Sequence, residues 1–366
     1  MFYETKKDLG LSCITIGCPK CGGHTKKNGR RGKHQRYLCL NCRFSFIRQH
    51  HSQTGLKQFR QFYQLITGKV NRSQLWQQNR QSRKSLSIIF QLFFSRPLSA
   101  AEVWEVLPPK LSTPWVYGMD GKWLKRLGVF MLHRNITTRE NLYWSFNPSE
   151  SYLALSLDLA KLIELLGGGV KGESKESFPI AAISDWKGAI VSAITAAFGD
   201  IPHQRCLTHV TRTAKTLLPQ KSPFLATLAL GEIAARLIQI KSHEEIAVWF
   251  SQLADWHDQY DCLLKERTKN PETKRGWWYT HGNLRRAWRL LTDNPKPFFQ
   301  YLDQPLLPHS NNSLEGTISQ ATNKLIDHRG MKLDQQVAFL NWYFTFTRVK
   351  NKQNLKKLWD YWKGRL

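Results

Sequence analysis

Apolar residues recur with two different periods along the middle of this chain. Aromatic and β-branched stretches bounded by polar turns predict strands, and apolar residues repeating every three to four positions predict helices. The predicted elements are strands at 115–124, 127–135 and 140–146, a helix at 151–166, a strand at 178–186, a helix at 188–199, a short strand around 203–206 and a further helix. This alternation predicts an α/β core around a mixed sheet.

The segments on either side of this core follow other patterns. Residues 54–95 have helical spacing with a stop at Gly68, and a cluster of prolines after residue 96 marks a boundary. Residues 222–300 read as helical and are rich in tryptophan. The expected organisation is a zinc ribbon at 1–50, a helix-turn-helix and linker at 51–110, a catalytic core in two parts at 111–221 and 306–366, and a helical insertion at 222–305.

Charge changes this picture at the N-terminal end. No Asp or Glu occurs in residues 9–101, which hold 17 Lys and Arg, and the net charge of the 366-residue chain is +27. Basic surfaces attract polyanions because each neutralised phosphate releases a condensed counterion. The hydrophobic fraction of 41% is enough for a sizeable core, so the chain is not a disordered basic tail. A protein that binds nucleic acid is indicated.

Four of the seven cysteines form two Cys-x2-Cys pairs. Seventeen residues separate the pairs, a spacing typical of a four-thiolate zinc site. The predicted zinc ligands are Cys18, Cys21, Cys39 and Cys42. This use of cysteine favours a reducing, cytoplasmic compartment, and neither a secretory leader nor a membrane-spanning apolar run is expected.

Basic side chains near the zinc ligands are candidate DNA contacts. A hairpin between the two cysteine pairs would project Arg30, Arg31, Lys33 and Arg36. The later helical stretches resemble a helix-turn-helix, whose second helix enters the major groove, so Arg83 and Lys84 are predicted to contact bases or phosphates there. The structural alternatives are a zinc staple without DNA contact and a helical linker with a solvated basic face.

Three acids stand out by position. Asp120 lies within the first apolar strand, Asp185 ends the fourth, and Glu315 begins a late helix. An acid in a buried strand is costly unless it is paired or bound to metal. Neighbouring strands can place two acids side by side, and Mg2+ (or Mn2+) is the natural occupant. Two such ions would activate a nucleophile and stabilise the leaving oxygen of a phosphodiester.

Each acid also has a structural interpretation. Asp120-Gly121 could form a turn, Asp185 could cap the following helix, and Glu315 could complete a capping box with Asn312. Taken as an ordered set behind a basic, zinc-binding front end, the three acids favour catalysis.

The order of these motifs resembles a bacterial insertion-sequence transposase of the Mutator-like DDE family. The motifs include GMDG at 118–121 and SDWKGAI at 184–190. The most specific elements are Asp185 followed about twenty residues later by Cys206-x2-His209, and NNSLEGTISQATNKLIDHRG at 311–330. The resemblance covers nearly the whole chain and aligns the family's three acids with Asp120, Asp185 and Glu315. It implies an RNase H-like fold interrupted by a helical insertion.

The resemblance also implies the activity. Metal-dependent hydrolysis at transposon ends would be followed by attack of the freed 3′-hydroxyl on target DNA. The expected partners are double-stranded DNA, as terminal inverted repeats and target, and further copies of the chain in at least a homodimer on DNA. A bacterial, nucleoid-associated location follows.

The roles of several motif residues stay open. His203, Cys206 and His209 could form a second metal site, but a single thiol without a fourth ligand favours packing or DNA positioning. Trp277 and Trp278 are candidates for stacking on an extruded base, with core packing as the alternative. Further candidate phosphate contacts are Arg285, Arg286, Arg289, Arg329 and Lys332.

Competing hypotheses place the protein in other classes. A domesticated or inactive transposase would bind or bridge DNA without chemistry, although it would have no reason to keep all three acids. A metal-dependent nuclease would cut without joining. A zinc hydrolase is disfavoured because four thiolates leave no open zinc position.

Overall fold

The computed structural model describes residues 17, 18, 21–32, 34–47, 51–70, 72–79, 83–111, 113–167, 178–272, 274–326 and 330–365. The chain divides into two compact units, 1–59 and 60–366, and each is described by itself. Within the described residues, no helix is both long and apolar enough to cross a membrane.

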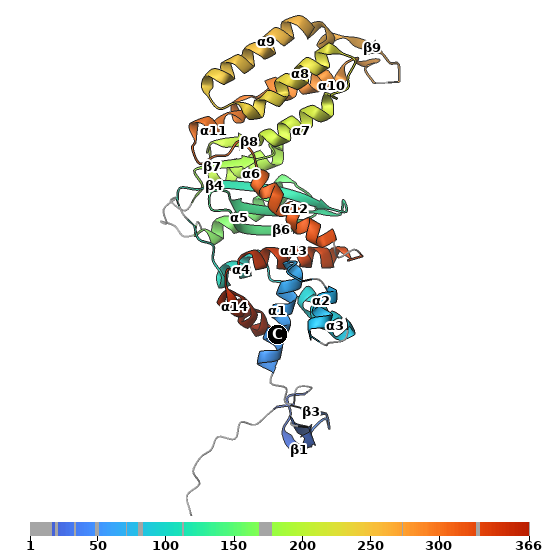
Figure 1. Ribbon diagram of the computed structural model, residues 1–366, viewed down its shortest axis with the longest axis vertical. Helices are drawn as coiled ribbons and strands as arrows, with labels where there is room; N and C mark the ends of the chain where they lie inside the picture. The colour runs from blue at the N-terminus through green and yellow to red at the C-terminus, as the bar shows by residue number, and fades with distance from the viewer. Residues whose placement is uncertain are drawn as a thin grey trace, which may run out of the picture. The chain divides into compact units, whose positions relative to one another are not determined.

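The first unit contains a small antiparallel sheet, drawn in dark blue in Figure 1. Strands β1 (Thr25–Arg31), β2 (His34–Cys39) and β3 (Ser45–Ile47) pair in the order β1-β2-β3. The register between β1 and β2 shifts between Lys27 and Arg30. So small a sheet buries little apolar surface, and a fold of this size needs an additional cross-link such as a metal.

The second unit begins with a series of helices. Helix α1 (His51–Ile66) crosses the unit boundary, and α2 (Arg72–Asn79), α3 (Arg83–Ser95) and α4 (Ala100–Val106) follow it. Gly68, where the sequence predicts the end of a helix, adopts φ +69° just after α1. Glycine reaches this left-handed conformation easily and therefore commonly ends helices. A capping box between Ser99 and Glu102 starts α4.

Aromatic side chains join these helices to the C-terminal part of the chain. Phe62 packs against the rings of Phe93 and Trp342 at centroid distances of 4.8 Å and 5.5 Å. The Trp342 indole donates to the carbonyl oxygen of Phe93, and that of Trp362 donates to Arg96. Trp342 belongs to α13 (Leu333–Thr347) and Trp362 to α14 (Lys352–Gly364).

A five-stranded mixed sheet forms the centre of the second unit (Figure 1). Its strand order is β6-β5-β4-β7-β8, in which β6, β5 and β4 pair antiparallel and β4, β7 and β8 pair parallel. The strands are β4 (Val116–Leu124), β5 (Gly128–Asn135), β6 (Glu140–Asn147), β7 (Ala181–Ser184) and β8 (His203–Arg205). The predicted mixed α/β architecture is therefore confirmed.

Different helices cover the two faces of this sheet. On one face, Tyr117 and Met119 share a core with side chains of α5 (Tyr152–Leu165) and α6 (Gly188–Phe198). On the other face, Phe130 stacks on Phe344 of α13. Since side chains alternate along a strand, Asp120 faces away from Met119 and toward the side that holds α13.

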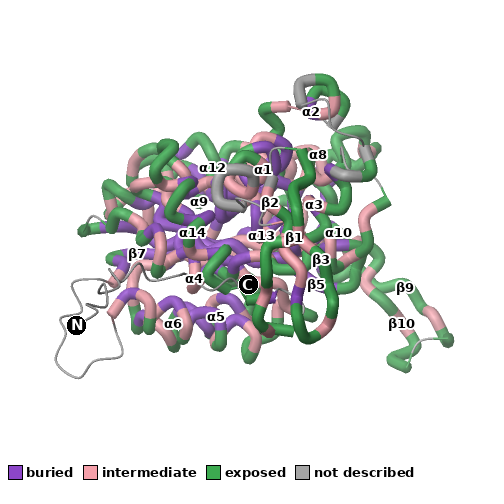
Figure 2. The backbone as a smooth tube through the Cα atoms, turned by 90° about the horizontal axis from the view of Figure 1, so that it is seen from below, coloured by how far each residue is buried: buried purple, intermediate pink, exposed green. Residues whose placement is uncertain are grey.

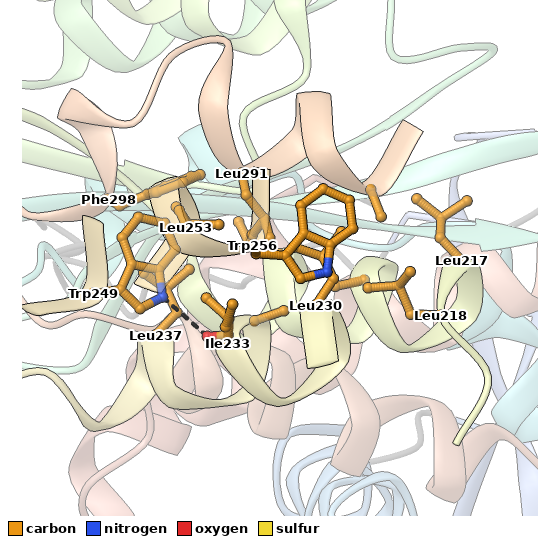
Figure 3. Close-up of a cluster of buried hydrophobic side chains, with 14 of the residues drawn as sticks. Leu217, Leu218, Leu230, Ile233, Leu237, Trp249, Leu253, Trp256, Leu291 and Phe298 are labelled. Atoms are coloured by element: carbon orange, nitrogen blue, oxygen red, sulfur yellow. Dashed lines mark hydrogen bonds between the residues drawn. The ribbon is translucent and has the colours of Figure 1, made fainter. Parts of the chain in front are cut away.

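The tryptophan-rich region forms a helical body with its own core (Figure 3). The core joins α7 (Leu207–Leu217), α8 (Leu225–Arg236), α9 (His243–Lys265) and α10 (Gly282–Thr292), and the short α11 (Gln300–Asp303) follows. Trp249 and Trp256 are buried, and their indoles donate to the carbonyl oxygens of Ile233 and Ala226, both at 2.9 Å. These bonds satisfy the only polar atom of each indole.

One feature of this region differs from the helical expectation. Strands β9 (Arg267–Lys269) and β10 (Trp277–Tyr279) form an antiparallel hairpin between α9 and α10. Its backbone is largely exposed in Figure 2. Three-residue strands carry no measurable period in the sequence, so the pairing of β9 with β10 could not be predicted from it.

Candidate functional site

The four predicted zinc ligands lie together in the first unit. The Sγ atoms of Cys18 and Cys42 are 3.6 Å apart, those of Cys21 and Cys39 are 3.5 Å apart, and all four lie within 4.8 Å of one another. The backbone N–H of Cys42 donates to the Cys39 sulfur and lowers the pKa of that thiol. This arrangement can bind one structural zinc ion.

Basic side chains of the same small sheet face solvent. Arg30, Arg31 and Arg36 are exposed, and the Arg36 Nε donates to the carbonyl oxygen of Asn28 at 2.9 Å. Lys33 lies outside the described residues. At the start of α3, Lys84 is exposed, and the side chain of Arg83 is outside the described set.

The two predicted aspartates occupy equivalent places on neighbouring strands. Strand β4 pairs parallel with β7, with Gly118 opposite Ile183. Asp120 and Asp185 each lie two residues further on, Asp120 within β4 and Asp185 one residue beyond the end of β7, so the two residues are at the same level along the sheet. Because alternate residues share a face, both side chains point to the same side of the sheet. Asp120 is within β4 and not in a turn.

The third acid reaches this place on α12 (Asn312–Ile326), which packs against β4. Asn311, just before the helix, is 1% exposed, and its side-chain N–H donates to the carbonyl oxygen of Met119 at 3.3 Å. Arg134 of β5 donates to the carbonyl oxygen of Ser313 at 3.2 Å. These two bonds hold the first turn of α12, and therefore Glu315, beside the strand that carries Asp120.

The electrostatics show that the three acids act on one another. Burial raises the pKa of Asp120 to about 7, and the negative charges of Asp185 and Glu315 add to that rise. The Gly121 N–H donates to the Asp120 carboxylate at 2.8 Å and opposes it.

Two residues missed by the sequence interpretation complete the charge balance. The Lys187 ammonium lies 3.0 Å from an oxygen of Asp185 and also contacts Glu150. Glu150 is only 10% exposed and lies beside Gly121, where a Cβ would meet its carboxylate at 2.9 Å. Burial works to lower the pKa of Lys187, but these two carboxylates raise it on balance. Lys187 therefore neutralises part of the acidic centre.

Glu315 has an arginine and a histidine of α7 as neighbours. Its Oε2 accepts from Arg212 at 3.1 Å, and its Oε1 lies 3.3 Å from Nδ1 of His209. The thiol of Cys206 is also close, since one ligand atom from each of Cys206, His209 and Glu315 falls within 4.8 Å of the others. The motif Cys206-x2-His209 thus lies at the acidic centre.

Capping does not account for the positions of these acids. Lys187, not Asp185, is the residue at the N-cap of α6, although Asp185 accepts from the Lys187 N–H at 3.3 Å. The Glu315 carboxylate pairs with α7 and makes no described bond to the backbone of Asn311 or Asn312. The capping-box interpretation of Glu315 is not what the structure shows.

The remaining candidates lie elsewhere. His203 hydrogen-bonds to Ser184 at 2.9 Å and packs on the ring of Trp186, away from the Cys206 cluster. Trp277 lies under the guanidinium of Arg267 at 4.1 Å, whereas Trp278 is 52% exposed.

The arginines predicted after these tryptophans are partly engaged. Arg285 covers the ring of Tyr279 and donates to Leu264, Arg289 pairs with Asp293, and Arg286 and Lys332 are exposed. Arg329 lies outside the described residues.

Comparison with known proteins adds no family. A scan of the chain against protein-family models finds no match, and a search of curated proteins finds none.

Proposed function

We propose that this protein is a DDE-type DNA transposase, similar to the Mutator-like transposases of bacterial insertion sequences. It would cut at transposon ends and transfer the 3′-hydroxyl into target DNA. One observation carries the proposal: Asp120 of β4 and Asp185, just after the parallel strand β7, lie at the same level, and α12 brings Glu315 close enough to act on Asp120. A mixed sheet with acids at this level supports an RNase H-like core.

The residues present fit divalent cations. Burial and mutual repulsion raise the pKa of Asp120 to about 7, so ionisation of the three acids together needs positive charge nearby. Asp120, Asp185 and Glu315 would hold two Mg2+ or Mn2+ ions. When bound, such ions activate the attacking oxygen and stabilise the leaving oxygen of the phosphodiester.

The chain's own side chains have distinct parts in this centre. Asp120 would supply oxygens from β4 and Asp185 from the residue after β7, whereas Glu315 is oriented by Arg212 and His209. Lys187 balances the charge of Asp185 and Glu150. If Asp185 held a cation, the Lys187 ammonium would be available to pair with a DNA phosphate.

Basic surfaces supply the DNA contacts of the proposal. Arg30, Arg31 and Arg36 on the small sheet would bind terminal repeats with Lys84 of α3, and Arg286 and Lys332 would meet the DNA backbone. The acting form on DNA would be at least a homodimer, because two ends must be joined. A cytoplasmic, nucleoid-associated location follows from this activity.

The test is transposition by purified protein in Mg2+. The donor is a DNA fragment carrying the gene with its native flanks, and new junctions in a recipient plasmid are sequenced. Asp120→Asn keeps the side-chain shape but loses the charge that binds metal, so it should abolish junctions while salt-sensitive DNA binding remains. Asp258→Asn, at an exposed position of α9, is the matched control and should leave junctions unchanged.

Each outcome has a definite meaning. Junctions at fixed ends with the wild type and none with Asp120→Asn would establish the activity. Cleavage without joining would indicate a nuclease. Binding without cleavage would favour the alternative of a domesticated or inactive transposase that acts as a DNA-binding protein. Junctions that persist in Asp120→Asn would remove Asp120 from the mechanism.

A further inference from the structure

The start of α7 presents a thiol and an imidazole side by side. Cys206 is the N-cap residue of the helix and His209 follows three positions later, so both lie on one face of the first turn. Cys206 is fully buried, while His209 is 27% exposed at its side chain. A helix that begins in this way offers one soft ligand and one imidazole to the same point in space.

Glu315 meets these two side chains from α12, a segment more than 100 residues later. Its Oε1 lies 3.3 Å from Nδ1 of His209, yet both atoms are buried and neither makes a hydrogen bond within the described part of the chain. Together with the Cys206 sulfur they fit within 4.8 Å. Buried polar atoms are normally satisfied, so a shared absence of hydrogen bonds calls for an explanation.

We propose that Cys206, His209 and Glu315 form a second zinc-type site, distinct from the four-cysteine site at 18–42. A thiolate, an imidazole and a carboxylate are the ligands that Zn2+, Co2+ and Cd2+ prefer, whereas Mg2+ does not take a sulfur ligand. The 3.3 Å between Nδ1 of His209 and Oε1 of Glu315 suits two ligands of one tetrahedral ion, and the Cys206 sulfur lies within 4.8 Å of both. The fourth corner is left for water or for a ligand oxygen.

Neighbouring groups orient two of the three ligands. The backbone N–H of Asn311 donates to the Cys206 sulfur at 3.2 Å, and Arg212 holds the second oxygen of Glu315 at 3.1 Å. Such contacts fix ligand geometry and support a thiolate once metal is bound. Metal binding replaces the S–H bond of Cys206 with a metal–sulfur bond and releases that proton to solvent.

The site would also regulate the acidic centre, and this consequence rests on the proposed function. Glu315 is the only residue common to the zinc-type set and the three acids. An ion held by Cys206 and His209 would take Glu315 away from the oxygens of Asp120 and Asp185. Zinc would then inhibit strand cleavage in competition with Mg2+, and removal of zinc by a chelator would restore cleavage.

The decisive experiment counts metal ions and needs no DNA. Full-length protein is equilibrated with excess Zn2+, passed through a desalting column and analysed for zinc by mass spectrometry. Wild type should retain about two ions per chain, one in each site. Cys206→Ser and His209→Gln should each retain about one, while Cys262→Ser, at an exposed cysteine of α9, should retain both.

A spectroscopic measurement covers the case in which a variant folds poorly. Co2+ added to wild-type protein whose four-cysteine site already holds zinc should produce a sulfur-to-cobalt charge-transfer band. The same band should appear in Cys262→Ser and be absent in Cys206→Ser, with circular dichroism confirming that the variants are folded.

The results can overturn the site and its consequence separately. A single zinc in wild type without a cobalt band, or a second zinc that persists in both Cys206→Ser and His209→Gln, would overturn the site. Two zinc ions without Mg2+-reversible inhibition of cleavage would leave the site and overturn its regulatory role. If the protein cleaves no DNA, the zinc count still decides the site, so the two failures are distinguishable.

Discussion

The cysteine cluster at 18–42 and the acidic centre of the sheet are built in opposite ways. Four soft ligands come from two Cys-x2-Cys pairs, and the sheet around them is small and largely exposed. At the acidic centre, hard ligands come from β4, from the end of β7 and from α12, held by a large core. In the first region, a bound metal would stabilise the fold. In the second region, a fold stabilised by its own hydrophobic core positions the residues that would bind a metal.

Removal of zinc should produce the largest effect, and only in the first region. Structural zinc contributes about 10 kcal/mol to the folding of small domains. A strong chelator should abolish hydrogen-exchange protection in β1, β2 and β3 and leave protection in β4 and β5 intact. Protection that survives in β1–β3 after complete zinc loss would show that these strands fold without metal.

Asp120→Asn should stabilise the protein, because its carboxylate is buried among like charges. The folded pKa is about 7, above the ordinary value of 3.8, so the folded state binds more protons between these values. Stability contributed by protonated Asp120 is therefore lost as pH rises toward 7. Without divalent ions, the gain in unfolding free energy from Asp120→Asn should be about 2–3 kcal/mol larger at pH 8 than at pH 5.

Magnesium supplies the control for that prediction. At pH 8, Mg2+ should raise the thermal midpoint of the wild type by binding the folded state, and should have little effect on Asp120→Asn. Equal stabilisation of both proteins by Mg2+ would show that the Asp120 carboxylate is not needed for Mg2+ binding.

Asn311→Ala should weaken the link between the strand and the glutamate helix. It removes a buried hydrogen bond to Met119 and should lower the unfolding free energy by about 1–3 kcal/mol, measured by urea titration. Asn312→Ala, at an exposed position, should change it by less than about 0.5 kcal/mol. Equal effects would mean that α12 is held by its apolar face alone.

Lys187→Gln should have a smaller effect that depends on metal. The Lys187 side chain is 51% exposed, so loss of its pairs with Asp185 and Glu150 should cost about 1 kcal/mol or less. The loss should disappear when Mg2+ is present in excess, as seen in thermal unfolding. Lys161→Gln breaks an exposed pair with Glu164. Any stability that this variant loses should be the same with and without Mg2+.

Arg30→Ala should change stability least and DNA affinity most clearly. The side chain is exposed on β1, so the unfolding free energy should stay within about 0.5 kcal/mol of wild type. If Arg30 binds a phosphate, the slope of log K against log salt concentration should fall by about one. An unchanged slope would assign the DNA contacts to other residues.

Local patterns were enough to predict much of this molecule. The Cys-x2-Cys pairs identify four ligands because each pair sits in one short turn. Alternating apolar residues identify β4 and β5, and acids placed in such strands mark Asp120 and Asp185 as unusual, since burial of a charge has a cost. These inferences concern residues that are neighbours in sequence or share one period.

Contacts between residues that are distant in sequence depend on how the elements pack together. Glu150 lies beside Gly121, Lys187 pairs with both Glu150 and Asp185, and Glu315 pairs with His209 and Arg212. No periodicity relates α7 to α12, which are about 100 residues apart and are brought together by the packing of α12 on β4. The ligand types can therefore be identified from the amino-acid sequence, whereas the packing of helices on the sheet sets which of these residues share a site.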